Sequence, residues 1–387
     1  MADIMRQHLL PAGYEFQKVL TDFERLSTGK ELFDRGLLKA VSECEDNNAR
    51  YDLLQRFSEY VLPHYDDIRG VYDEIRSALR QAVTSARITV LKPIETPFGK
   101  TDKIVGGSGT YVAYAASHLT NPIQQISIVG NDFPEEEMNE LKKRGVNLSG
   151  VEIVPDQKSF FWSGRYHLDM NTRDTLVTDL NVLANFNPKV PEEYQGAEYL
   201  MLGNLMPSLQ LSVIEQLRTR PDLVVLDTMN FWMETAMDDL KKVLKKVDVL
   251  LINDSEARQL SGEYSLVKCA KQILQMGPRF LIIKKGEHGA LLFHEDQVFF
   301  APALPLEDVF DPTGAGDAFA GGFIGHIDNT KNISFENMKT AIIVGSAMAS
   351  FCVEAFGPQR LKEISKEDID LRLEEFVQLV NFDISLV

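Results

Sequence analysis

The chain has 387 residues, of which 44% are hydrophobic, and its formal net charge is −17. This length predicts two or three domains, or one large α/β domain with an addition, and it allows a core without disulfide or metal staples. The three cysteines, Cys44, Cys269 and Cys352, form no CxxC pair, which argues against a disulfide scaffold or zinc site and favours a reducing compartment.

The charge and hydropathy patterns exclude further classes of protein. The 57 acidic residues outnumber the 40 basic residues, which disfavours binding to nucleic acid or to an anionic membrane. The first residues lack the apolar core of a signal peptide, and no run reaches the roughly 18 apolar residues of a membrane span. We therefore expect a cytoplasmic globular protein whose partner is neither nucleic acid nor membrane.

Residues 1–85 differ in character from the rest of the chain. Apolar residues recur there at three- and four-residue steps, as at Phe16, Val19, Leu20 and Phe23. This spacing predicts amphipathic helices and almost no strand. We expect an all-helical segment that serves packing or oligomerisation, with a ligand-sensing role as the alternative.

Residues 86–387 alternate short β-branched runs with amphipathic segments. The expected strands are Arg87–Leu91, Gln125–Val129, Tyr199–Leu202, Leu223–Asp227, Val247–Ile252 and Phe280–Lys284. Helices are expected between most of them, as at Leu209–Thr219 and Thr235–Leu244. This alternation predicts an α/β fold with a doubly wound, mostly parallel sheet, which binds ligands at the carboxyl ends of its strands.

A glycine-rich stretch at residues 308–323 carries the strongest chemical signal. Gly314, Ala315 and Gly316 allow a tight turn that exposes backbone N–H groups, and a helix is expected to begin near Asp317. Unpaired amides at a helix N-terminus form an anion hole, and a carboxylate there can take a proton from an attacking hydroxyl. The alternative is a simple glycine turn with Asp317 as a helix cap.

Residues 311–323 read Asp-Pro-Thr-Gly-Ala-Gly-Asp-Ala-Phe-Ala-Gly-Gly-Phe, which closely resembles the C-terminal signature of the PfkB, or ribokinase-like, carbohydrate and nucleoside kinases. Four further motifs agree in order and spacing: Gly106-Gly107-Ser108, Ile128-Val-Gly-Asn-Asp132, Asn253-Asp-Ser-Glu256 and Lys285-Gly-Glu-His-Gly289. The resemblance covers about residues 94–365. It implies a ribokinase-like sheet with a small β-sheet lid, and ATP-dependent phosphorylation of a hydroxyl on a small sugar or nucleoside.

The resemblance also implies roles for residues on the phosphate side. Asp317 would be the general base, and the amides of Gly314, Ala315, Gly316 and Asp317 would form the anion hole. ATP and Mg²⁺ would be held by Asn253, Glu256 (through water to Mg²⁺), Lys284, Gly286 and Gly289. Some relatives bind a monovalent cation such as K⁺, for which Asp311, Thr313 and residues 349–357 are the candidates. Asn253 and Glu256 also match a capping box, which is their structural alternative.

On the substrate side, the resemblance places Gly106 and Gly107 against the sugar and lid strands near residues 94–104 and 157–185. Alternating aromatic and polar residues predict strands at Phe160–Tyr166 and Asn171–Asn181. Arg165 and Asn230 are candidate substrate ligands. The alternative for the lid aromatics is sheet packing or a contact between lids in a homodimer.

One departure concerns the start of the domain. The family that this chain resembles usually carries a substrate-binding aspartate near the position of Lys92, and lysine cannot accept hydrogen bonds from hydroxyls. Either Glu95 or Asp102 substitutes, or the substrate differs, or substrate binding is impaired. A catalytically weakened, nucleotide- or sugar-binding sensor is therefore the second hypothesis. A Rossmann oxidoreductase is set aside because residues 106–110 lack the GxGxxG spacing.

Overall fold

The computed structural model describes residues 90–92, 94–101, 104–171 and 173–381. The helices expected in residues 1–85, and the first part of the strand expected at Arg87–Leu91, lie outside the described residues. Within these ranges, no helix combines the length and apolarity that crossing a membrane requires.

The largest element is a six-stranded sheet with the order β14-β13-β12-β11-β10-β9. Its four parallel strands are β9 (Tyr199–Leu202), β10 (Leu223–Asp227), β11 (Val249–Asn253) and β12 (Phe280–Lys284). The hairpin β13 (Ala290–His294) and β14 (Gln297–Ala301) extends the sheet in antiparallel fashion. β10 is buried along its whole length, because helices cover both faces and continuous apolar runs suit such strands.

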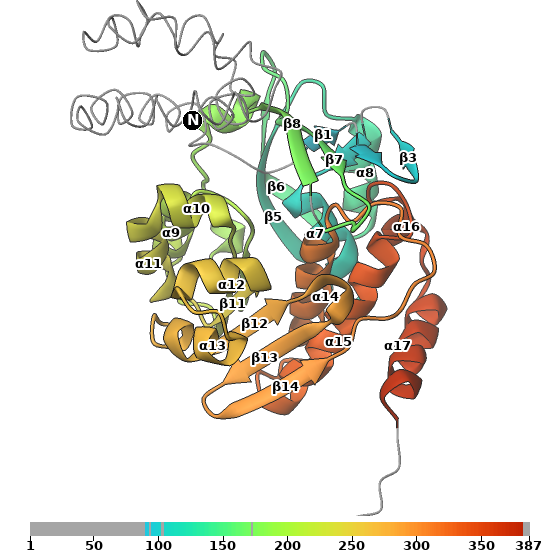
Figure 1. Cartoon of the computed structure of the whole chain (residues 1–387). Helices are drawn as coiled ribbons and strands as arrows, with labels where there is room; N and C mark the ends of the chain where they lie inside the picture. The colour runs from blue at the N-terminus through green and yellow to red at the C-terminus, as the bar shows by residue number, and fades with distance from the viewer. Residues whose placement is uncertain (1–89, 93, 102–103, 172, 382–387) are drawn as a thin grey trace, which may run out of the picture. The chain divides into compact units, whose positions relative to one another are not determined.

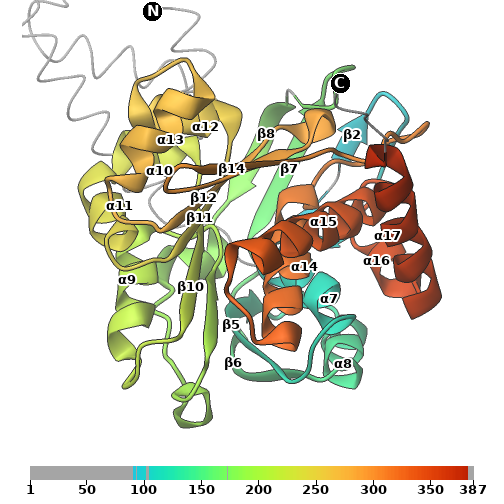
Figure 2. The same ribbon diagram turned by 90° about the horizontal axis from the view of Figure 1, so that it is seen from below.

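Successive residues of each strand enter two separate cores. Leu226 and Leu250 pack on one face, and Val225 and Leu251 pack on the other. The first face is covered by α9 (Pro207–Gln216), α10 (Asn230–Thr235), α11 (Met237–Leu244), α12 (Asp254–Ser261) and α13 (Leu266–Leu274). The second is covered by α14 (Ala315–Thr330) and α15 (Phe335–Cys352). Figures 1 and 2 show the two helix groups on opposite sides of the sheet, as expected for a doubly wound fold.

A second, two-stranded parallel sheet joins β5 (Ile123–Gly130) to β6 (Val146–Val154). We expected the segment Gln125–Val129 within the main sheet, and this detail is wrong for the described residues, because β5 and β9 do not pair. A cavity of about 420 Å³ separates them, lined by Gln125 and Ile126 on one side and Leu200 and Leu202 on the other. Among the described residues, each of these two strands therefore has one open edge.

The third sheet contains the strands in which we expect the lid, and we call it the lid sheet, or lid, below. Its order is β3-β2-β7-β1-β4, with β8 paired to β7. The strands are β1 (Val90–Lys92), β2 (Ile94–Thr96), β3 (Gly99–Lys100), β4 (Ile104–Gly106), β7 (Phe161–Tyr166) and β8 (Arg173–Asp179). β1 occupies part of the strand expected at Arg87–Leu91, but it pairs with β4 and β7 in the lid, whereas we expected it in the main sheet. Short 3₁₀ turns follow at Asn181–Asn185, Glu192–Tyr194 and Gly286–His288.

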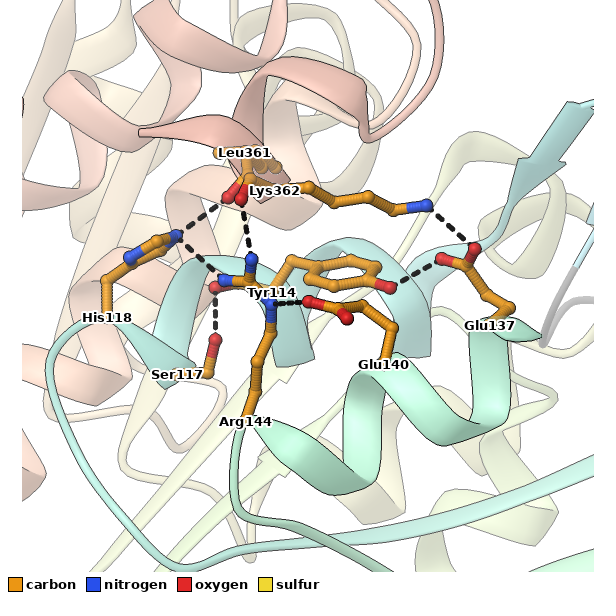
Figure 3. Close-up of polar contacts among 8 residues, drawn as sticks. All are labelled: Tyr114, Ser117, His118, Glu137, Glu140, Arg144, Leu361 and Lys362. Carbon is orange, nitrogen blue, oxygen red and sulfur yellow. Dashed lines mark hydrogen bonds and ion pairs between the residues drawn. The ribbon is translucent and has the colours of Figure 1, made fainter. Parts of the chain in front are cut away.

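A polar network ties three further helices together (Figure 3). These helices are α7 (Ser108–Ser117), α8 (Glu135–Lys143) and α16 (Gln359–Glu363). The last helix of the described chain is α17 (Lys366–Val380). The buried Glu137 carboxylate accepts hydrogen bonds from the Tyr114 hydroxyl at 2.5 Å and from Lys362 Nζ at 2.7 Å. Arg144 donates to the Lys362 carbonyl at 2.5 Å, and His118 Nε2 lies 2.7 Å from the Leu361 carbonyl. The network fixes α7, whose N-terminus reaches the candidate site.

Candidate active site

Polar residues end three neighbouring strands of the main sheet. Asp227 ends β10, while Asn253 and Lys284 end β11 and β12 and lie opposite each other in register. Lys284 Nζ forms an ion pair with Asp227 Oδ1 at 3.0 Å. Burial alone would lower the pKa of Lys284, but Asp227 and then Glu256 raise it. The lysine therefore stays charged and places a cation at the carboxyl edge of the sheet.

The N-terminus of α14 lies beside this cation. Gly314 adopts φ +86°, and α14 begins at Ala315, two residues before the expected start near Asp317, because the left-handed glycine turns the chain directly into the helix. The Ala318 N–H donates to the Gly314 carbonyl at 2.7 Å, so Gly314 accepts a helical hydrogen bond in the first turn of α14.

Close neighbours restrict the space for a side chain at two glycines of the loop. A Cβ on Gly314 would lie 2.5 Å from the Tyr111 ring, and one on Gly316 would lie 3.1 Å from Lys284 Nζ. The amide of Ala315 donates to the Pro312 carbonyl at 3.2 Å, so this member of the expected four-amide hole is engaged in the turn. Lys284 thus lies against the same helix end that we expect to bind phosphate.

Asp317 lies in the first turn of α14, and its Oδ1 accepts a hydrogen bond from the Ser108 hydroxyl. Ser108 is the first residue of α7 and follows Gly107, whose φ is +96°. Gly106, at the end of β4, brings the chain out of the lid to this point. Ser108 thereby joins the glycine pair to the glycine-rich loop. The sequence placed Ser108 in the motif but indicated no role for it.

Asn253 and Glu256 form the capping box that was their structural alternative. Asn253 Oδ1 accepts from the Glu256 amide at 2.8 Å, and Glu256 Oε2 accepts from the Asn253 amide at 2.7 Å. Burial raises the pKa of Glu256 to about 7, against the lowering effect of Lys284. The box engages Oε2 of the Glu256 carboxylate.

The loop from β12 to β13 brings Gly286 and Gly289 to the same edge of the sheet. Both have positive φ, +56° and +80°. A Cβ on Gly289 would lie 2.0 Å from the Ala301 carbonyl oxygen, and one on Gly286 would lie 2.7 Å from Asn171 Oδ1. Asn171 belongs to the β7–β8 turn, so the tip of the lid touches this loop.

Asp311 is fully buried. Its two carboxylate oxygens accept from the amides of Thr313 at 2.9 Å and Gly357 at 3.0 Å. Asp311 therefore links the start of the glycine-rich loop to the segment after α15 by hydrogen bonds. Both oxygens of the Asp311 carboxylate have a backbone amide as partner. The monovalent cation expected at this residue stays a prediction.

The remaining substrate-side candidates, Arg165 and Asn230, each pair with another side chain. Arg165 is half exposed and forms an ion pair with Glu95 at 3.2 Å, whereas its neighbour Tyr166 is buried. Asn230 donates to the side chain of Gln259. Lys92 lies opposite Ile104 in the lid sheet.

Comparisons with known proteins agree with this geometry. Residues 75–364 match the family described as pfkB family carbohydrate kinase. A cytidine kinase of Thermococcus kodakarensis is 29% identical over 233 residues, which are 59% of this chain and 82% of the relative. A nucleoside kinase of Methanothermobacter thermautotrophicus is 25% identical over 272 residues, which are 66% of this chain and 80% of the relative.

Solved structures show the same fold. A Burkholderia thailandensis nucleoside kinase in complex with inosine has a TM-score of 0.61 at 22% identity, covering 74% of this chain and 96% of that one. A Ribokinase II from E. coli, described as putative and in complex with ATP and Mg²⁺, also has a TM-score of 0.61, at 18% identity, covering 76% of this chain and 97% of that one. The chain belongs to the PfkB family. It is a carbohydrate or nucleoside kinase with a ribokinase-like fold.

Proposed function

We propose that this chain transfers the γ-phosphoryl group of ATP to a hydroxyl of a small sugar or nucleoside. The observation that carries the proposal is the contact at Asp317, whose carboxylate already receives a hydrogen bond from a hydroxyl, that of Ser108. An acceptor hydroxyl in the same place would meet a base and, next to it, the positive N-terminal end of α14.

In this proposal Asp317 takes the proton from the acceptor oxygen as that oxygen attacks. The amides of Gly314, Gly316 and Asp317 stabilise the negative charge on the phosphoryl group in transfer, and Ala315 contributes as its turn contact loosens. Lys284, held 3.0 Å from Asp227, neutralises phosphate charge from the strand side.

The residues at the sheet edge fit ATP and Mg²⁺. Bound Mg²⁺ would draw charge away from the phosphates. Glu256, with Asn253 positioning it through the capping box, would hold waters of the metal, which suits magnesium's habit of keeping its hydration shell. Gly286 and Gly289 let the backbone pass close to the nucleotide. Asp311 remains the candidate for a K⁺-binding position, and a homodimer remains a prediction.

The acceptor would lie on the side of Gly106 and Gly107, where no Cβ obstructs the backbone. Several curated relatives are named for nucleosides, such as the cytidine kinase, and others for sugars, such as a Lactococcus lactis ribokinase that is 26% identical. The proposal therefore spans both acceptor classes.

A second candidate function rests on Lys92. A cation where relatives usually carry an aspartate would weaken acceptor binding and leave a protein that binds nucleotide without turnover. The test is a panel of nucleosides and sugars, followed for ATP-dependent formation of phosphorylated product, with ATP binding measured in parallel. Turnover of any member supports the kinase, whereas ATP binding without turnover supports the sensor.

A further inference from the structure

The Ser108 hydroxyl lies where the proposed function puts the acceptor hydroxyl. It donates a hydrogen bond to Oδ1 of Asp317, the residue that we assign as the general base. Ser108 is 8% exposed, and Asp317 is half-buried. A serine in hydrogen-bond contact with a carboxylate is set up as a nucleophile, because the carboxylate can take the proton while the serine oxygen attacks.

Close packing of α7 against α14 holds this contact in place. Figures 1 and 2 show the two helices side by side. A Cβ on Gly321 of α14 would lie 2.5 Å from the Val112 carbonyl oxygen of α7, and one on Gly325 would lie 3.2 Å from Ala116 Cα. With backbones this close, the N-terminal ends of the two helices have little freedom to separate, so the serine and the carboxylate are held in a fixed geometry.

The Ser108 side chain has free space on one side. Gly203 follows β9, and a Cβ there would lie 3.1 Å from Ser108 Oγ. Both residues line the cavity of about 420 Å³ beside β9. Because glycine leaves this side of the hydroxyl uncovered, a phosphoryl group on Ser108 Oγ would have room toward the cavity.

The charges around Ser108 favour an anion. Ser108 is the first residue of α7, and its hydroxyl contacts the first turn of α14, so the positive ends of two helices meet at this point. Lys284 Nζ adds a full positive charge beside α14, since it would lie 3.1 Å from a Cβ on Gly316. A phosphate on a serine at a helix N-terminus is stabilised by such a field.

We propose that Ser108 is a self-phosphorylation site, which takes the γ-phosphoryl group of ATP when no acceptor is bound. The bond between Ser108 Oγ and the γ-phosphorus forms as the bond from that phosphorus to the β,γ-bridging oxygen breaks. ADP leaves with the electron pair of the broken bond, and Asp317 takes the hydroxyl proton. This inference rests on the proposed function, because it uses the same base and the same phosphoryl donor. The modified serine then fills the place of the acceptor hydroxyl, so the phosphorylated chain no longer turns over acceptor.

The experiment compares the full-length wild type with Ser108→Ala, Ser108→Thr and Asp317→Asn. Ser117→Ala is the matched control, since Ser117 lies on the same helix and its hydroxyl donates to the Tyr114 carbonyl at 2.8 Å. Each protein is incubated with Mg²⁺ and γ-labelled ATP without acceptor, at several protein concentrations. Intact-mass and peptide mass spectrometry count and locate the phosphate before and after the incubation, and thermal melting checks that each variant is folded.

We expect one phosphoryl group per chain, located at Ser108, in the wild type and in Ser117→Ala. The rate should not depend on protein concentration, because nucleophile and base belong to one chain. Ser108→Ala should gain no phosphate, Ser108→Thr should be labelled at the same position, and Asp317→Asn should be labelled about 10²–10⁴-fold more slowly, the range of general base catalysis. The acceptor that the panel identifies should slow the labelling, because it competes for the same place.

Turnover of an acceptor with no phosphate at Ser108 would overturn the inference and leave the proposed function intact; the hydrogen bond to Asp317 would then serve only to join α7 to α14. Labelling of Asp317→Asn as fast as the wild type, or phosphate at another residue, would also overturn it. Phosphate at Ser108 without turnover of any acceptor would support the inference and count against transfer to a small sugar or nucleoside. If neither product forms, both proposals fail.

Discussion

At the scale of single residues, the sequence motifs pointed to the candidates on the phosphate side. They did not predict which side chains from distant parts of the chain form hydrogen bonds with each other. Ser108 and Asp317 are 209 positions apart, and Tyr166 and Thr313 are 147 apart. Such pairs depend on how sheets and helices stack, and no local pattern encodes them. Alternating aromatics did identify the lid strand that carries Tyr166, but they could not show which face it uses.

Glu256 gives a residue-scale prediction about pH. Because burial raises its pKa to about 7, lowering the pH from 8 to 6 protonates the carboxylate that we assign to the Mg²⁺ waters. We expect the affinity for Mg²⁺·ATP to be about tenfold weaker at pH 6 than at its high-pH plateau, as one required ionisation dictates. Calorimetric titration across this range measures it.

Glu256→Gln is the control, because glutamine can also complete a capping box and so preserves the start of α12. The variant should bind Mg²⁺·ATP more weakly and lose this pH dependence. If variant and wild type show the same pH profile, Glu256 is not the titrating group.

At the scale of elements, the polar network in Figure 3 holds α7, α8 and α16 together. Replacing Glu137 with alanine would leave the Tyr114 hydroxyl and the Lys362 ammonium without their shared acceptor. We expect a loss of about 3 kcal/mol in the free energy of unfolding, because unpaired buried polar and charged groups are costly. Urea denaturation measures the change.

Glu136→Ala is the matched control, since Glu136 lies on the same helix and is exposed. It should alter the free energy of unfolding by no more than about 0.5 kcal/mol. Equal effects of the two substitutions would show that the network contributes nothing beyond the helix itself.

Element boundaries show where sequence patterns were informative. The strands at Tyr199–Leu202, Leu223–Asp227 and Phe280–Lys284 were predicted with the bounds that the structure has, because continuous apolar runs flanked by polar residues are unambiguous. The start of α14 was expected near Asp317, and the helix begins two residues earlier, at Ala315. Residue propensities do not show that Gly314 adopts the left-handed conformation that turns the chain into the helix.

At the scale of the whole molecule, the sequence predicted the doubly wound fold, but it did not predict that β5 and β9 lie apart. Whether two strands pair depends on what lies between them in the folded protein. The spacing of apolar residues in the sequence carries no information about this. The open edges beside the 420 Å³ cavity carry a prediction. Alternate amides of β5 and β9 should exchange with deuterium faster than those of β10 and β11, which are paired on both sides.

Native-state hydrogen exchange read by mass spectrometry or NMR distinguishes the outcomes. Fast exchange at β5 and β9 would confirm that both edges are open in solution. Exchange as slow as in β10 would contradict this and show that another extended segment pairs between them.

The central claim is that Asp317 removes the proton from an acceptor hydroxyl while phosphoryl transfer takes place at the N-terminus of α14. The most direct measurement is the transfer of the γ-phosphoryl group of labelled ATP to the identified acceptor by the wild type and by Asp317→Asn. The account predicts a rate about 10²–10⁴-fold lower for the variant, the range of general base catalysis, with nucleotide affinity and melting temperature preserved. A variant that transfers phosphate as fast as the wild type would contradict it.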